Sequence, residues 1–237
     1  MARAAGLDPV ARRRFGRVLG YGLMRAALAL LVVVLAACGG KDDDAGAPRT
    51  QARRPADDTQ REQARFDAER RPDLVIQALA IGPGARVADV GAGTGLLTVH
   101  LARAVAPTGT VVATDIDGAV LELLKARLDA TGLGGVVERK VVGSETPELE
   151  AGAYDAILLA EVDHYFADAT GWLEAATAAL RPHGRIVISN RIHHRARSMA
   201  DAQKAGLELI SESTPVPTHF MAVFGAPGGK GKRTDRP

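Results

Sequence analysis

The chain has 237 residues, enough for one domain with additional segments at its ends. Apolar residues make up 46% and charged residues 24%, which is ordinary for a globular protein. The net charge is +2, but residues 1–38 contribute +5, so the remainder carries −3, which argues against a nucleic-acid partner. Cys38 is the only cysteine, which excludes an intramolecular disulfide and a cysteine-based metal site.

The N-terminal segment has the pattern of an export signal. Residues 26–37 form an apolar run, which is shorter than the roughly 20 residues that span a bilayer and has the length of the apolar part of a signal peptide. The run ends in LAAC at 35–38, which resembles the lipobox of bacterial lipoproteins. The resemblance implies a signal peptide over residues 1–37, a lipid on Cys38, and a membrane-anchored protein that faces the periplasm.

Several details qualify the N-terminal prediction. Gly39 follows the cysteine, which by the same resemblance favours the outer membrane. A plain anchor or a misassigned start stays open, because the segment from Met24 is a complete short signal by itself. The stretch RRRFGR at 12–17 loosely resembles a twin-arginine export signal. Residues 38–57 lack apolar periodicity and predict a disordered tether, and residues 226–237 predict a disordered basic tail.

From residue 58 onward, strand and helix patterns alternate. We expect helices over 60–80, 96–105, 118–130 and 169–180, and strands over 86–90, 110–114, 136–142, 154–160 and 185–189. Two last strands, 207–211 and 219–224, have only a loop between them and must form an antiparallel hairpin, because a parallel crossover needs about a dozen residues. Residues 58–225 therefore predict an α/β domain with a mostly parallel sheet and helices on both faces.

A glycine-rich turn, VADVGAGTG at 87–95, follows the first strand. Dinucleotide folds carry G-x-G-x-x-G, but here Leu96 stands where the third glycine is required. Asp89, two residues before the first glycine, would repel a pyrophosphate and would suit a cationic cofactor. S-adenosylmethionine carries an ammonium, a sulfonium and no phosphate, so the electrostatics favour it over NAD.

The same stretch is similar to motif I of class I S-adenosylmethionine-dependent methyltransferases. LRPHGRIVIS at 180–189 resembles their L-x-P-G-G-x-L segment, with His183 in place of the first glycine. The resemblance implies a Rossmann-like methyltransferase fold, with a seven-stranded sheet whose last strand is antiparallel. It also implies S-adenosylmethionine as cofactor, and an enzyme that moves a methyl group to a small-molecule acceptor by direct displacement.

The resemblance also implies roles for single residues. Asp89 would orient the ammonium of the cofactor, Asp115 would accept hydrogen bonds from both ribose hydroxyls, and Ile116 would cover the adenine. Asp117 is a weaker candidate for the ribose, because a helix N-cap already explains it. The backbone of the glycine turn would approach the methionine part of the cofactor, and we assign this contact to Gly91, Ala92, Gly93 and Gly95.

The remaining candidates follow later strands. Ser144 and Glu145 lie where the family reads the adenine amino group, and either of them contacts adenine or both are loop residues. After strand 154–160, Glu161 would help to hold the cofactor, and His164 would accept a proton from the acceptor or be a packing or capping histidine. We predict no metal site, since His193 and His194 lack a third ligand nearby; they form an anion-binding patch or a solvated surface.

Two other functions compete with methyl transfer. The changes at Ser144 and His183 would suit a non-catalytic binding lipoprotein on a methyltransferase fold, since fold does not fix function. An intact Asp89 and Asp115 argue against that alternative. An NAD-dependent oxidoreductase is disfavoured by Leu96 and by Asp89.

Overall fold

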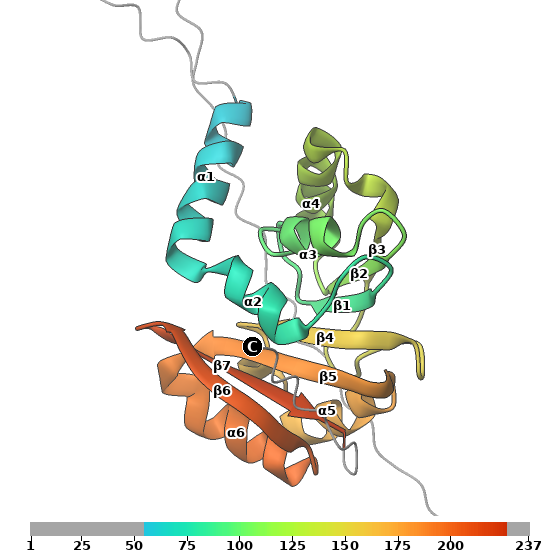
Figure 1. Cartoon of the computed structure of the whole chain (residues 1–237), viewed down its shortest axis with the longest axis vertical. Coiled ribbons are helices and arrows are strands. Elements are labelled where there is room, and N and C mark those ends of the chain that lie inside the picture. The colour runs from blue at the N-terminus through green and yellow to red at the C-terminus, as the bar shows by residue number, and fades with distance from the viewer. Residues whose placement is uncertain (1–54, 227–237) are drawn as a thin grey trace, which may run out of the picture. The chain divides into compact units, whose positions relative to one another are not determined.

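The computed structural model describes residues 55–226, and the side chains from residue 58 onward. The predicted signal peptide, Cys38 and nearly all of the basic tail lie outside this part. One seven-stranded sheet runs through the described residues in the order β3-β2-β1-β4-β5-β7-β6 (Figure 1). Its strands are β1 Arg86–Val90, β2 Thr110–Asp115, β3 Val137–Val141, β4 Tyr154–Ala160, β5 Leu180–Arg191, β6 Glu208–Val216 and β7 His219–Gly225.

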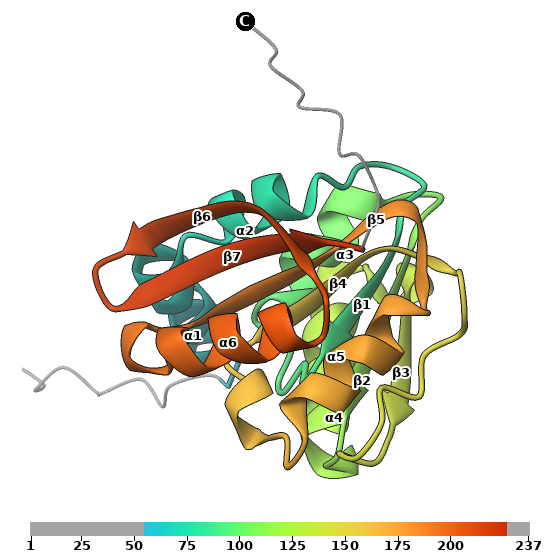
Figure 2. The same cartoon turned by 90° about the horizontal axis from the view of Figure 1, so that it is seen from below.

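The helices cover both faces of this sheet. They are α1 Pro55–Arg70, α2 Pro72–Leu79, α3 Thr98–Val105, α4 Gly118–Thr131, α5 Ala169–Thr177 and α6 Arg195–Lys204. Helices α2, α3 and α4 share one buried cluster, to which each contributes apolar residues such as Val75, Leu101 and Leu124. Helices α5 and α6 bury Trp172 and Ala202 in a second cluster on the other face (Figure 2).

Strand β7 is the exception to the parallel sheet. It pairs antiparallel with β5 and with β6, while β1 to β5 pair in parallel. The predicted α/β class, the seven strands and the antiparallel last strand are therefore confirmed. Strand β1 lies between β2 and β4, so the chain order reverses there. In such sheets ligands bind beyond the carboxyl ends of the strands at this switch point.

Three details differ from the sequence prediction. The helix expected over 60–80 is two helices, because Arg71 adopts a left-handed φ of 50° immediately before Pro72. The helix expected to reach residue 180 ends at Thr177, and Leu180 already pairs with Tyr154 at the start of β5. Helix α6 was not expected.

The LRPHGR segment forms a bulge within β5. Leu180 pairs with Tyr154 and Arg185 pairs with Ala156, so four residues of β5 lie between these pairs where β4 has only Asp155. His183 lies in this bulge with a φ of 68°, a left-handed conformation that glycine adopts without strain. This conformation explains why the L-x-P-G-G-x-L segment of the methyltransferases carries glycine at this position.

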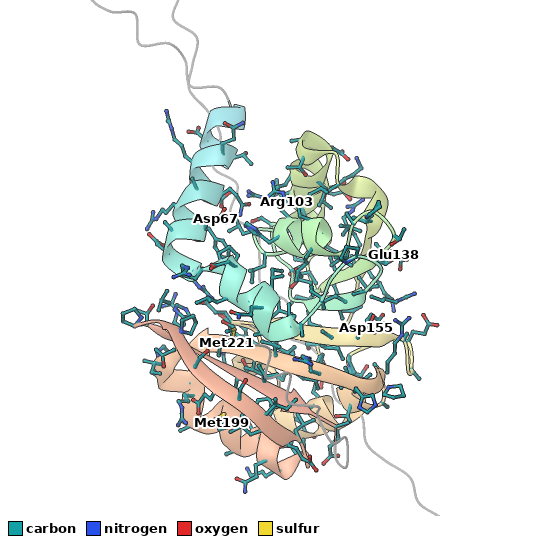
Figure 3. All side chains as sticks on the ribbon, viewed as in Figure 1. Asp67, Arg103, Glu138, Asp155, Met199 and Met221 are labelled. Atoms are coloured by element: carbon teal, nitrogen blue, oxygen red, sulfur yellow. The ribbon has the colours of Figure 1, made fainter. Side chains whose placement is uncertain are left out.

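Helix α1 is attached to the domain by polar contacts. His100 Nε2 lies 2.7 Å from Asp67 Oδ1, and the guanidinium of Arg127 donates to Glu62 at 2.6 Å. Gln63 donates to the carbonyl oxygen of Leu96 at 3.0 Å. Figure 3 shows Asp67 on the side of α1 that faces α3. Within the described residues, no helix combines the length and the apolar character needed to cross a membrane.

Candidate cofactor site

Two cavities lie at the carboxyl ends of β1, β2 and β4. The first has a volume of about 270 Å³ and is lined by the ends of these strands and by the loop after β3. The second has a volume of about 170 Å³ and lies between the glycine turn and helix α1. Both are lined by Gly91, Ala160 and Glu161, so they form the two ends of one site.

The first cavity holds the predicted ribose and adenine residues. Asp115 ends β2, and its carboxylate accepts hydrogen bonds from the backbone N–H of Gly93 at 2.9 Å and of Asp117 at 3.0 Å. Ile116 lines the cavity with a side chain that is 68% exposed, and Ser144 lines its far wall. Asp117 caps α4 by accepting from Ala119 N at 2.8 Å, which confirms the capping interpretation.

The same cavity has an aromatic wall and one buried hydroxyl group without a hydrogen-bond partner. Phe166 and Trp172 stack with ring centroids 4.4 Å apart, and Tyr165 lines the cavity while 76% exposed. Thr114 also lines it, and its buried hydroxyl oxygen has no hydrogen-bond partner in the described part of the chain. A buried hydroxyl without a partner is costly, so a ligand that bonds it would be stabilised.

The second cavity holds charges of both signs. Asp89 is 2% exposed and accepts a hydrogen bond from the hydroxyl of Thr98 at 2.6 Å. Burial raises the pKa of Asp89 to about 6, with the nearby charge of Asp115 acting in the same direction and the Thr98 hydrogen bond opposing it. Arg70, from the last turn of α1, lines the same cavity.

Glu161 joins helix α1 to strands β5 and β7. Its Oε1 lies 2.5 Å from Arg70 Nη1, 2.5 Å from His219 Nε2 and 3.8 Å from Arg191 Nε. Burial alone would raise the pKa of Glu161, but the hydrogen bond with His219 and the charge of Arg70 outweigh it and hold that pKa below its usual value. Burial lowers the pKa of His219, and the hydrogen bond with Glu161 opposes this shift.

The backbone at Glu161 is left-handed, with a φ of 55°. Such strain in a residue other than glycine costs about 1–3 kcal/mol and clusters at functional sites. Here it places the carboxylate between the two cavities, where three cationic or donor side chains hold it.

The glycines of the turn have different reasons for lacking a side chain. A Cβ on Gly91 would lie 2.8 Å from Val162 Cγ2, and one on Gly95 would lie 2.7 Å from Leu124 Cγ. Gly95 lines neither cavity and serves packing against α4. A Cβ on Gly93 would meet nothing within 4 Å, and Gly93 and Ala92 line the second cavity. The space above Gly93 is therefore available to a ligand.

Besides Gly95, two more predicted site residues lie apart from the cavities. Glu145 is exposed, lines neither cavity and accepts from the Ser144 hydroxyl at 3.3 Å. His164 lines neither cavity; its Nδ1 lies 3.0 Å from Asn190 Nδ2, and its ring stacks on His194 with centroids 4.1 Å apart. Their roles stay predictions. Among the described residues, no group of three or more possible ligand side chains could hold a metal ion.

The sequence prediction missed Arg70, Thr98, Thr114 and His219. Arg70 and Glu161 are 91 positions apart, and His219 lies on the last strand, so no local pattern joins them. Thr98 is three residues past the end of the glycine turn, and a hydroxyl so close to Asp89 in the sequence could have indicated this hydrogen bond.

The donors and acceptors of this site fit S-adenosylmethionine. Its ribose diol would face the Asp115 carboxylate and the unpartnered Thr114 hydroxyl in the first cavity. Its amino-acid end would lie among Asp89, Glu161 and Arg70 in the second. The open space above Gly93 would accept the part that joins these two ends.

Comparison with known proteins agrees with this geometry. Residues 88–186 match the family model described as a methyltransferase domain. The chain is 34% identical over 143 residues to a ubiquinone biosynthesis O-methyltransferase of Xanthomonas axonopodis, covering 60% of this chain and 56% of that protein. It is 38% identical over 115 residues to a protein-L-isoaspartate O-methyltransferase of Methylorubrum extorquens, covering 48% of this chain and 46% of that protein. The chain thus spans about half the length of the curated relatives it matches.

Among solved structures, an S-adenosylmethionine-dependent methyltransferase from Aquifex aeolicus superposes with a TM-score of 0.64. The superposition covers 73% of this chain and 98% of that one at 17% identity, which establishes a shared fold. With the strand order, the superposition shows that the described residues have the Rossmann-like fold of methyltransferases, and residues 88–186 within them match the methyltransferase-domain family model.

Proposed function

We propose that this protein is an S-adenosylmethionine-dependent methyltransferase that acts on a small-molecule acceptor. One observation carries the proposal: the second cavity combines a guanidinium with two carboxylates, those of Arg70, Asp89 and Glu161. A zwitterionic amino-acid end next to a sulfonium offers the complementary charges. A dinucleotide would instead bring phosphates to Asp89. This carboxylate is buried and forms no ion pair within the described residues, so no paired cation there would offset the repulsion.

We assign the following roles to the site residues. Asp115 holds the ribose hydroxyls, Ile116 covers the adenine, and Ser144 lies at its edge. Asp89 accepts from the ammonium, while Arg70 and the backbone N–H groups of the turn donate to the carboxylate. When bound, the cofactor supplies an electrophilic methyl group and a neutral thioether leaving group.

The chain's contribution to transfer is mainly alignment, which alone supplies a large part of the acceleration in displacements between two bound groups. Glu161 fixes α1 to the sheet through Arg70 and His219, so the site is closed over the methionine end. His164 stays our candidate for accepting the proton of a hydroxyl acceptor, with Asn190 orienting its ring. The match to a ubiquinone biosynthesis O-methyltransferase supports an oxygen acceptor such as a hydroxyl.

Calorimetric titration of the chain from residue 39 with S-adenosylmethionine, and separately with NAD, tests the proposal. We expect saturable binding of the first alone, lost in Asp115→Ala and kept in Asp129→Ala, an exposed control on α4. Binding of NAD, or equal binding by both variants, would contradict it. Cofactor binding without methyl transfer to any small hydroxyl acceptor would favour the binding-protein alternative.

We also propose that the protein is a lipoprotein of a bacterial envelope, anchored through Cys38 and facing the periplasm. The support is the LAAC sequence at the end of the apolar run, and all of it lies outside the described residues. A lipid adds about 0.8 kcal/mol of membrane affinity per buried CH₂, so two or more chains anchor a protein stably. Cys38→Ala is expected to move the protein from the membrane fraction to the soluble fraction; retention in the membrane would contradict lipidation.

A further inference from the structure

A third cavity lies on the sheet face beneath α2 and shares no lining residue with the cofactor site. Its volume is about 430 Å³, at the lower end for small-molecule pockets. Its floor is apolar, formed by Leu74 and Ala78 of α2 and by Met221 and Val223 of β7. Figure 3 labels Met221 close to where α2 passes the strands β5 and β7.

The polar part of this cavity is positively charged. Arg185 of β5 lines it, and among the described residues no carboxylate lies within ion-pair distance of its guanidinium. The other guanidiniums that are similarly withdrawn from solvent do have such partners: Arg70 lies 2.5 Å from Glu161, and Arg127 lies 2.6 Å from Glu62. The one described hydrogen bond of the Arg185 side chain is a long one, 3.4 Å from Nη1 to the carbonyl oxygen of Ala78.

An unpaired cation at this depth costs free energy, since burial removes its hydration without returning a counter-charge. Burial accordingly lowers the pKa of Arg185. In the same cavity, β6 supplies three hydroxyl side chains, those of Ser211, Ser213 and Thr214, as hydrogen-bond donors. A guanidinium with several hydroxyls and no acid is the donor set that binds carboxylates and phosphates.

We propose that this cavity is a second binding site, for a small organic anion that joins a carboxylate or phosphate group to a short apolar chain. The anionic head would pair with Arg185 and the hydroxyls of β6, and the chain would lie on the apolar floor. The site is independent of the proposed methyl transfer, because it uses none of the cofactor residues.

The test is calorimetric titration of the full chain in lipid nanodiscs, with empty nanodiscs as blank. Hexanoate and hexyl phosphate probe the two head groups, and hexylammonium probes the apolar chain alone. We expect saturable binding of at least one anion and no binding of the ammonium. Arg185→Gln should weaken anion binding about tenfold or more, as expected for loss of a charge-assisted hydrogen bond, whereas Arg103→Gln, an exposed arginine outside the cavity, should leave it unchanged.

A second variant keeps the test decisive if Arg185→Gln fails to fold. Ala78→Leu fills the apolar end of the cavity with a good helix former and leaves the guanidinium in place. It should also weaken anion binding, while S-adenosylmethionine binding stays unchanged. Equal anion binding by wild type and both variants, equal binding of hexylammonium, or no saturable binding of either anion would overturn the proposal and leave Arg185 as a cap for the end of α2.

Discussion

Replacing Asp89 by asparagine should stabilise the fold while it weakens cofactor binding. The pKa of Asp89 rises from 3.8 to about 6 because the carboxylate is buried. Each pKa unit corresponds to about 1.4 kcal/mol, so ionised Asp89 costs the folded state about 3 kcal/mol. Asparagine has no charge to bury, and its carbonyl oxygen can accept the same hydrogen bond from Thr98.

The size of this gain in stability depends on pH. An acid whose folded-state pKa lies above its unfolded value favours folding below the unfolded pKa, and this contribution is lost as pH rises through the folded pKa. The gain in Asp89→Asn should therefore reach up to about 3 kcal/mol at pH 7.5 and shrink toward zero near pH 4.

Urea unfolding of the chain from residue 39, at both pH values, measures this gain. Asp129→Asn, an exposed change on α4, serves as control and should alter the unfolding free energy by less than about 1 kcal/mol. A variant of Asp89 that is no more stable than wild type at pH 7.5, or whose gain does not change with pH, would refute the reasoning.

Further predictions concern the turn and the bulge. Binding of S-adenosylmethionine should weaken by up to about tenfold per pH unit below pH 6, where Asp89 takes up a proton, and titrations from pH 5 to 8 should show no such slope in Asp89→Asn. Gly91→Ala should cost about 1–3 kcal/mol of unfolding free energy because its φ is 69° and its Cβ meets Val162, whereas Gly93→Ala should cost about 1 kcal/mol and chiefly weaken cofactor binding. His183→Gly should raise the unfolding free energy by about 1 kcal/mol, because it relieves a left-handed conformation at the cost of a more flexible unfolded chain; no gain would contradict the strain assigned to the bulge.

The elements that the sequence predicted best are those whose burial leaves a local pattern. Strands β1 and β4 are mostly apolar segments in the middle of the sheet, and the predicted bounds agree with the observed ones. Helix α6 has the sequence RARSMADAQK and buries only Ser198 and Ala202, so its apolar stripe is too narrow to be recognised. The early end of α5 depends on a pairing between Leu180 and Tyr154 that no local pattern contains.

The residues of the candidate site also divide into those that a local sequence pattern predicts and those that it does not. Asp89, the turn glycines and Asp115 could be found because they sit at fixed distances from two predicted strand ends. Arg70 could not, because it reaches the site from the helix that precedes the motif, through a contact with Glu161. The orientation of His164 likewise depends on Asn190 at the end of β5 and on stacking with His194.

We propose that one end of the site binds the ribose of the cofactor and that the other end binds its amino-acid part. Titration with S-adenosylhomocysteine and with 5′-methylthioadenosine, which lacks the amino-acid end, separates the two. We predict that Arg70→Gln weakens binding of S-adenosylhomocysteine about tenfold or more, as for a lost charge-assisted bond, and leaves binding of methylthioadenosine unchanged, while Asp115→Ala weakens both. Equal weakening of both ligands by Arg70→Gln, or of neither, would contradict the assignment of the second cavity.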